Sequence, residues 1–89
     1  MKAIVSVLGE DKKGIIAKVS TALYDMDINV EDISQTIMQR YFTMIMLVNL
    51  EDSKLKFSQI NENLSALGRE TGVDIRIQSE AIFDSMHRI

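Results

Sequence analysis

The chain of 89 residues contains no cysteine and no proline. Without cysteine it forms no disulfide, no thiolate metal site and no cysteine nucleophile. The absence of disulfides makes the cytoplasm the expected location. Without proline or a low-complexity stretch there is no sign of a linker, so at this length we expect a single domain.

Long apolar runs and clustered positive charge are lacking too. No apolar run approaches the roughly 20 residues that a membrane span requires. The apolar start, residues 1–8, is followed at once by Gly9-Glu10-Asp11, which is too short and too quickly charged a pattern for a signal peptide. The formal net charge is -3, and no clustered basic face is visible. We therefore expect neither a nucleic-acid partner nor a membrane partner.

Groups that could perform catalysis are scarce. The single histidine, His87, lies near the C-terminal end and is expected to be a solvated tail residue. Nucleophilic catalysis needs a nucleophile beside an oriented base, and no such grouping is visible. The acidic pairs, such as Glu31-Asp32, have no histidine or second acid in phase with them. The sequence therefore predicts a protein that is not an enzyme and that holds no metal and no cofactor.

The hydrophobic pattern predicts the order βαββαβ. Alternation of apolar and polar residues indicates half-buried strands, and apolar residues three or four apart indicate helices. The first helix should begin near Asp11 or Lys12, where the acid suits the exposed N–H groups, and the second after Asp52 or Ser53, either of which can cap a helix. The expected strands cover residues 2–8, 29–39, 41–50 and 73–78, and the expected helices end near residues 25–27 and at 72.

This order indicates an α+β, ferredoxin-like sandwich. Its antiparallel sheet has the strand order 4-1-3-2, and both helices cover one face. The strand at 41–50 is apolar on both faces and should lie inside the sheet, whereas 29–39 should lie at an edge. Residues 1–79 then form the domain. Residues 80–89 form an amphipathic tail of the same domain, a short helix with an apolar stripe made of Ile82, Phe83, Met86 and Ile89.

One constellation suggests a binding site. The loop at residues 9–14 leads into the N-terminus of the first helix, where unpaired N–H groups attract a carboxylate or phosphate. Gly9 and Gly14 would allow backbone and ligand to approach closely. The same residues also fit a tight strand-to-helix turn without any ligand, and the physical argument alone does not choose between the two. Other functions of the fold lack their residues, such as paired cysteines for copper or stacking aromatics for RNA.

Three segments resemble ACT domains. Residues 9–19, GEDKKGIIAKV, are similar to the first loop and helix of that family, and Ile28-Asn29-Val30 is similar to its entry into the second strand. Residues 32–37, DISQTI, look like the second strand of small free-standing ACT proteins related to glycine cleavage system regulators. The resemblance covers the whole chain.

The resemblance implies a homodimer or larger assembly that binds an amino acid between subunits. Asp11 then matches the polar position of the first loop, Gly14 the family glycine, and Asn29 the amide supplied by the other subunit. The expected ligand-binding residues are Gly9, Asp11, Gly14, Ile15 and Asn29. The expected function is a small-molecule-binding regulatory module that acts as a homodimer. The alternative is a protein–protein interaction module without a bound ligand.

Overall fold

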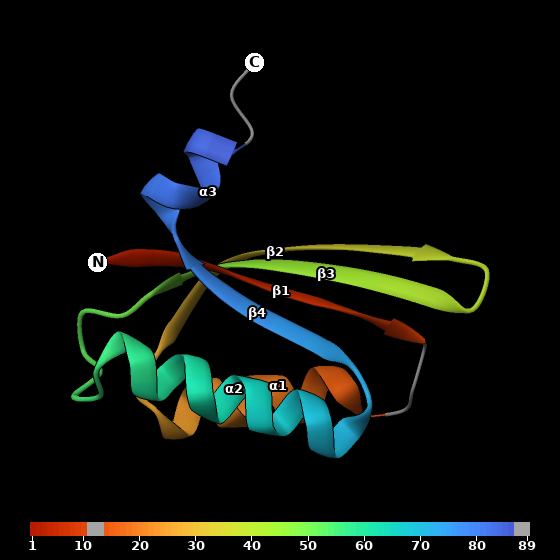
Figure 1. Cartoon of the computed structure of the whole chain (residues 1–89), viewed down its shortest axis with the longest axis horizontal. Coiled ribbons are helices and arrows are strands. Elements are labelled where there is room, and N and C mark those ends of the chain that lie inside the picture. Colours follow the sequence, from red (N-terminus) through yellow and green to blue (C-terminus); the bar gives the residue numbers. More distant parts are fainter. Residues whose placement is uncertain (11–13, 87–89) are drawn as a thin grey trace.

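A computed structural model describes residues 1–10 and 14–86 (Figure 1). Its elements are β1 (Lys2–Glu10), α1 (Ile15–Asp25), β2 (Asn29–Met38), β3 (Tyr41–Asn49), α2 (Phe57–Thr71), β4 (Asp74–Ser79) and α3 (Glu80–Met86). The predicted βαββαβ order with an appended short helix is confirmed.

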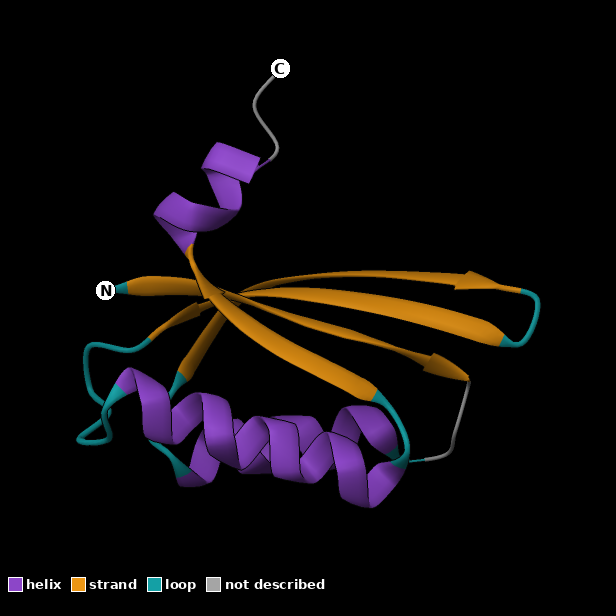
Figure 2. Cartoon of the chain, in the orientation of Figure 1, coloured by secondary structure: helices purple, strands orange, loops and turns teal. Residues whose placement is uncertain are grey.

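The four strands form one antiparallel sheet in the order β2-β3-β1-β4. This is the predicted order 4-1-3-2, with β3 inside the sheet and β2 at an edge. The sheet separates two layers of helix, since α1 and α2 lie on one side and α3 rises from the other (Figures 1 and 2). The far end of the β2–β3 hairpin extends beyond the two long helices (Figure 2).

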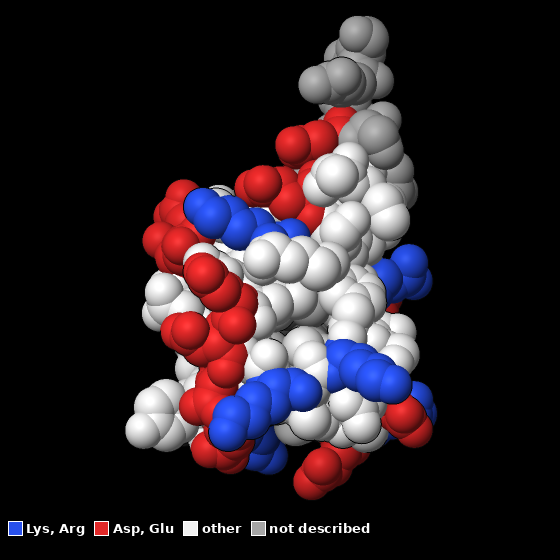
Figure 3. Space-filling view, turned by 90° about the vertical axis from the view of Figure 1, so that its left-hand side faces the viewer, with Lys and Arg blue, Asp and Glu red and all other residues white. Residues whose placement is uncertain are grey.

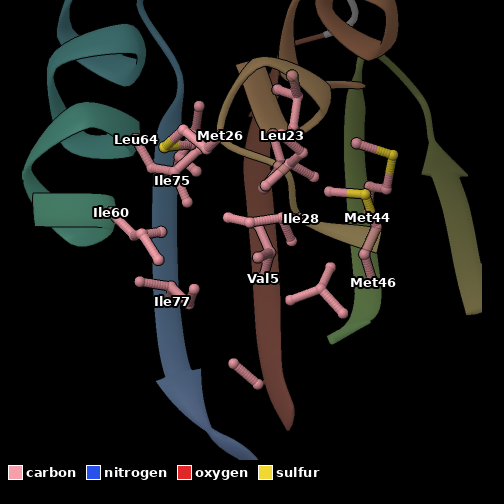
Figure 4. Packing of buried hydrophobic residues seen from close by; sticks show 14 of the residues in the cluster. Val5, Leu23, Met26, Ile28, Met44, Met46, Ile60, Leu64, Ile75 and Ile77 are labelled. Carbon is pink, nitrogen blue, oxygen red and sulfur yellow. The ribbon is translucent and has the colours of Figure 1, made fainter. Parts of the chain in front are cut away.

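The core fills the space between the sheet and the two long helices (Figure 4). Alternation decides which strand residues enter it, because successive side chains of a strand point to opposite faces. From β1 and β3 the buried side chains are Ala3, Val5, Val7, Phe42, Met44, Met46 and Val48. Leu23 of α1 and Ile60 and Leu64 of α2 cover them from the helix layer. The described part of the chain buries no polar or charged residue in this core.

Three turns take the backbone conformation that their residues permit. Asp27, after α1, has φ 58°, and Gln39, in the β2–β3 turn, has φ 55°. Gly72, with φ 77°, ends α2 by donating its backbone N–H to the Gly68 carbonyl over 2.8 Å. Glycine adopts this left-handed conformation without the steric cost that a Cβ brings. The predicted ends of both helices and the predicted turn at Gln39-Arg40 are confirmed.

The predicted starts of the two helices are wrong. The first helix begins at Ile15 rather than near Asp11 or Lys12, because Gly14 has a φ of 83° that is incompatible with a right-handed helix. The second begins at Phe57, preceded by a segment in which the Ser53 backbone N–H donates to the Leu50 carbonyl.

The start of α2 is fixed by a residue inside the helix. The Gln59 side-chain oxygen accepts a hydrogen bond of 2.9 Å from the backbone N–H of Lys56. This contact satisfies an N–H group just before the first turn, as the second half of a capping box does. The prediction placed the cap at Asp52 or Ser53 because it relied on residue type, whereas the observed contact joins residues three apart.

The expected loop at residues 9–14 is also shorter than predicted. Gly9 and Glu10 belong to β1 and pair with Phe42 and Tyr41 of β3. The strand continues because β3 offers hydrogen-bonding partners up to its first residue, and that long-range pairing outweighs the turn character of Gly9.

The surface carries charges of both signs. In Figure 3, acidic side chains gather along one edge of the view, and lysine and arginine side chains are scattered among them. Ion pairs join Lys2 to Glu31, Arg40 to Glu10 and Arg76 to Asp74. No helix in the described ranges is both long enough and apolar enough to cross a membrane.

Candidate functional site

The N-terminus of α1 is the first part of the candidate site. Gly14 occupies the N-cap position with φ 83° and ψ 0°, and no side chain caps the helix there. The first turn contains no acidic residue, and the first intrahelical bond runs from the Lys18 N–H to the Gly14 carbonyl over 2.9 Å. Helix N–H groups without a capping side chain attract anions, and the helix dipole adds to this attraction. This end of α1 is therefore suited to a carboxylate or phosphate.

The two predicted glycines differ in what surrounds them. A Cβ on Gly14 would meet no atom within 4 Å, so the requirement for glycine comes from its φ alone. A Cβ on Gly9 would lie 2.7 Å from Cγ1 of Val73, at the turn before β4. Gly9 therefore has a packing reason to be glycine, and its predicted contact with a ligand stays a prediction.

Ile15 can offer a ligand only its backbone. Its side chain is 3% exposed and belongs to the core between α1 and the sheet. The N–H group of the same residue lies in the first turn of α1, directly after Gly14. Asp11, the predicted polar residue of the loop, lies outside the described residues.

Asn29 lies at the opposite end of the sheet. It pairs with Asn49 of β3, whereas Gly9 pairs with Phe42 of the same strand. The seven residue steps from Phe42 to Asn49 correspond to about 23 Å along a strand. Within one chain the structure brings Gly9, Gly14 and Ile15 to one end and leaves Asn29 at the other.

A β-bulge next to Asn29 is a feature that the sequence did not predict. The register of β2 against β3 shifts between Val30 and Asp32. The residue in between, Glu31, points its carboxylate to Lys2 of β1, with Nζ 2.9 Å from Oε1. The hydrogen bond from Lys2 lowers the pKa of the Glu31 carboxyl below 4.5, and the bond to Glu31 raises the pKa of Lys2 above 10.5. The ion pair between Glu31 at the bulge and Lys2 therefore links the start of β2 to the start of β1 across β3.

This ion pair predicts a pH dependence. Because folding lowers the pKa of Glu31, its contribution to stability is present above pH 4.5 and is lost as the pH falls through the folded-state pKa. The wild-type chain should therefore lose stability on acidification more steeply than Glu31→Gln. Chemical unfolding of both proteins between neutral pH and pH 3 measures the difference.

The matched control for this test is Glu62→Gln, which changes an exposed acid of α2. Its acid dependence should follow that of the wild type. If Glu31→Gln also followed the wild type, the ion pair with Lys2 would contribute nothing to stability in solution. The effect should be small, because the side chains of Lys2 and Glu31 are 46% and 29% exposed and water screens their interaction.

Two hollows on the described surface lie away from the predicted residues. One, of about 450 Å³, is formed at the turn from α2 to β4 by residues that include Gly68, Gly72 and Val73. The other, of about 420 Å³, lies between α1 and α2 and includes Lys18 and Leu67. Neither hollow is lined by Gly9, Gly14, Ile15 or Asn29. In the described ranges, no three acidic or histidine side chains come together as metal ligands would.

Comparison with known proteins gives a consistent result. Residues 2–78 match the model of the ACT domain family. A UPF0237 protein from Clostridium acetobutylicum is 55% identical over 89 residues, which is 100% of both chains.

Solved structures agree with the sequence match. An ACT domain protein from Streptococcus pneumoniae superimposes with a TM-score of 0.82 and 44% identity, covering 93% of each chain. A protein assigned as a glycine cleavage system transcriptional repressor shares the fold with a TM-score of 0.76. It is 19% identical, and the match covers 86% of this chain and 44% of the other. The predicted relation to small free-standing ACT proteins is confirmed, and the repressor shares the fold. ACT domains are generally regulatory, small-molecule-binding modules rather than catalytic ones, and this chain belongs to the ACT domain family.

Proposed function

We propose that this protein is a regulatory module that binds an amino acid at the interface of a homodimer. The observation that carries the proposal is the position of the two predicted halves of the site. The uncapped N-terminus of α1 and Asn29 lie at opposite ends of one chain's sheet. A single small ligand can contact both only if they come from different chains.

The β2 edge provides a way for two chains to meet. An edge strand presents unpaired N–H and C=O groups that can pair with another strand. If two β2 strands pair antiparallel about a two-fold axis at Ser34, Asn29 of each chain comes near Met38 of the other. That is the end of the sheet at which Gly14 begins α1. Pairing at this edge therefore brings the partner subunit's Asn29 to the correct end.

The apolar side chains of β2 support the same pairing. Ile33 and Ile37 point to the helix side of the sheet, in register with Met46 and Phe42, yet they are 48% and 58% exposed. They are exposed because α1 does not reach the outer half of the hairpin (Figure 1). A second chain joined at β2 would place its own Ile33 and Ile37 next to them. Burial of such surface stabilises association by about 25 cal/mol per Å² before the costs of association are subtracted.

The carboxylate and ammonium groups of an amino acid match the two halves of the proposed site. Its carboxylate would accept hydrogen bonds from the first-turn N–H groups of α1 at Gly14 and Ile15. Its ammonium group would meet Asp11 or a backbone carbonyl of the loop. The amide of the partner subunit's Asn29 can both donate and accept, so it could contact either group.

The test is a thermal shift measurement with each of the twenty amino acids. We expect at least one of them to raise the melting temperature of the wild type, because a ligand at 100 times its Kd stabilises the folded state by about 2.7 kcal/mol. Asn29→Ala should lose this shift. Asn61→Ala changes an exposed asparagine of α2 and should keep it.

Two outcomes would contradict parts of the proposal separately. No shift with any amino acid would exclude this class of ligand. If Asn29→Ala keeps the thermal shift, the amino acid binds, but the amide of the partner's Asn29 is not part of its site. Sedimentation of Ile37→Asp tests the edge pairing itself, since a charge among the apolar side chains of that contact should separate the two chains.

A further inference from the structure

The hollow at the turn from α2 to β4 has a local cause in the sequence. Ser65, Gly68 and Arg69 of α2 and the C-cap residue Gly72 follow one another at the spacing i, i+3, i+4 and i+7, which places them along one stripe of the helix. Two of the four are glycines and have no side chain. The hollow of about 450 Å³ lies along this stripe, and sites for small molecules commonly measure roughly 300–1,000 Å³.

The floor of the hollow is held in place by close contacts. Val73, which is 8% exposed, lies between two glycines. A Cβ on Gly9 would lie 2.7 Å from Val73 Cγ1, and a Cβ on Gly68 would lie 2.7 Å from the Val73 backbone oxygen. The N–H groups of Gly72 and Val73 both donate to the Gly68 carbonyl, over 2.8 and 3.0 Å. A ligand therefore meets a surface that is already formed, and binding costs little ordering of the chain.

Two polar side chains on the α2 wall have their donors available. Among the described residues, no hydrogen bond or ion pair engages the side chain of Ser65 or that of Arg69. Ser65 is half-buried, and its hydroxyl can donate one hydrogen bond. Arg69, one turn further along the same stripe, carries five N–H donors in a planar fork. The wall therefore presents donors and a positive charge to the hollow.

The acid on the opposite wall is already neutralised. Asp74, the first residue of β4, accepts hydrogen bonds from Nε of Arg76, which lies 3.3 Å from Oδ1 and 3.2 Å from Oδ2. Asp74 and Arg69 are the charged residues in the described lining of the hollow. Because Arg76 balances Asp74, the charge of Arg69 is the one that a ligand can complement.

The end of α2 reduces this positive charge without cancelling it. The free carbonyl groups at a helix C-terminus act as about half a negative elementary charge. Arg69 lies in the last turn of α2 and contributes a full positive charge. The balance is weakly positive, which suits one carboxylate better than a doubly charged phosphate. An ammonium group would meet no free acid there, since Asp74 is already paired with Arg76.

We propose that this hollow is a second ligand site, which binds the carboxylate of a small apolar organic acid through Arg69 and Ser65. The guanidinium fork matches both oxygens of a carboxylate, and the Ser65 hydroxyl adds a third donor. The carbon part of the acid lies against Val73 and Ile75, the apolar residues of the lining. The site lies within one chain, so it needs neither the β2 edge nor the partner subunit's Asn29.

The first test follows the backbone amide resonances of the isotope-labelled protein during titration with benzoate, which joins one carboxylate to an apolar ring. The resonances of Gly68, Gly72 and Val73 should shift with a common dissociation constant. Benzamide has the same shape without the charge and should bind about tenfold more weakly. The proposal is wrong if no resonance shifts. It is also wrong if the shifts are confined to Gly14 and Ile15, at the N-terminus of α1.

Charge variants test the role of the arginine. Arg69→Gln should weaken benzoate binding about tenfold, because it removes the charge-assisted hydrogen bonds. Lys54→Gln is the matched control, since it removes one positive charge from an exposed residue outside the hollow, and it should bind as the wild type does. Equal affinities for the two variants would mean that net charge alone governs binding, and the assignment to Arg69 would fail.

A filling variant tests the hollow itself. Ser65→Leu removes the hydroxyl and occupies the hollow with a larger side chain, so benzoate should no longer shift the Gly72 resonance. Ser58→Leu makes the same change at an exposed position in the first turn of α2 and should bind benzoate normally. The amide spectrum of each variant shows whether it is folded. Undiminished binding by folded Ser65→Leu would contradict the proposal.

Asn29→Ala separates this site from the proposed function. It should lose the response to amino acids and keep the benzoate shift at Gly72, whereas Arg69→Gln should do the reverse. Loss of both responses in Asn29→Ala would place benzoate at the subunit interface and remove it from the hollow. A protein that binds benzoate at Gly72 and responds to no amino acid has this site and lacks the proposed one.

Discussion

Replacing Ile60 with alanine is expected to lower the free energy of unfolding by about 2–5 kcal/mol, as removal of a buried aliphatic side chain does. Ile60 is 1% exposed and projects from α2 toward β4 (Figure 4). The loss has two parts, the transfer free energy of the removed methylene and methyl groups and the cavity that they leave. For a domain of 89 residues the total stability is about 4–13 kcal/mol. This one change therefore removes a large share of it, and urea denaturation measures the loss.

The matched control is Ile16→Ala. The same chemical change is made in a helix, but Ile16 is 42% exposed. Part of its side chain is already in water, and alanine is the better helix former, so the cost should stay below about 1 kcal/mol. Equal losses at the two positions would show that α2 does not pack on the sheet as described.

The sequence predicted the strands well because their signal is local. The alternation around Val5 and Val7 and the doubly apolar pattern of β3 assign each side chain to a face without knowledge of the rest of the fold. The sheet order followed from the ferredoxin-like topology, which places the doubly apolar strand at residues 41–50 inside the sheet, as its composition requires. These inferences depend on periodicities that the backbone itself imposes.

The element ends were less predictable because they depend on distant partners. Gly9 and Glu10 look like a turn, and they remain in β1 because Phe42 and Tyr41 offer hydrogen bonds. The bulge at Glu31 likewise has no local signal, since its carboxylate is held by Lys2, far away in the sequence. Neither contact produces a periodic pattern in the sequence.

The residues of the candidate site, too, were predictable only where the signal is local in the sequence. Gly14 was predicted to lie in the turn before the first helix, and it lies there with a φ of 83°. That Gly9 must accommodate Val73 was not predictable, since the contact joins the end of β1 to the turn before β4. The distance between Asn29 and the start of α1 follows from the topology. It is this distance that makes a second chain necessary for the proposed site.

A second large effect is expected at Gly68, in the interior of α2. By helix propensity alone, Gly68→Ala should stabilise the protein by about 1 kcal/mol. We expect the opposite sign. A Cβ at this position would lie 2.7 Å from the backbone oxygen of Val73 and 3.4 Å from the backbone nitrogen of Ile75. These are main-chain atoms at the start of β4, so they cannot move aside as a side chain can. To relieve the contact, α2 must shift away from the sheet, and overpacking of this kind costs about 1–3 kcal/mol.

Ala66→Gly in the same helix isolates the propensity contribution. Ala66 is exposed, so its replacement should cost about 1 kcal/mol through the backbone alone. If the close approach of α2 to β4 is correct, Gly68→Ala and Ala66→Gly both lower the midpoint of thermal unfolding, although they exchange the same two residues in opposite directions. Gly68→Val, which adds two further methyl groups against the same main chain, should be less stable than Gly68→Ala. A rise in the midpoint for Gly68→Ala would mean that α2 stands further from β4 than described. Gly68 would then lower helix stability without any compensating contact.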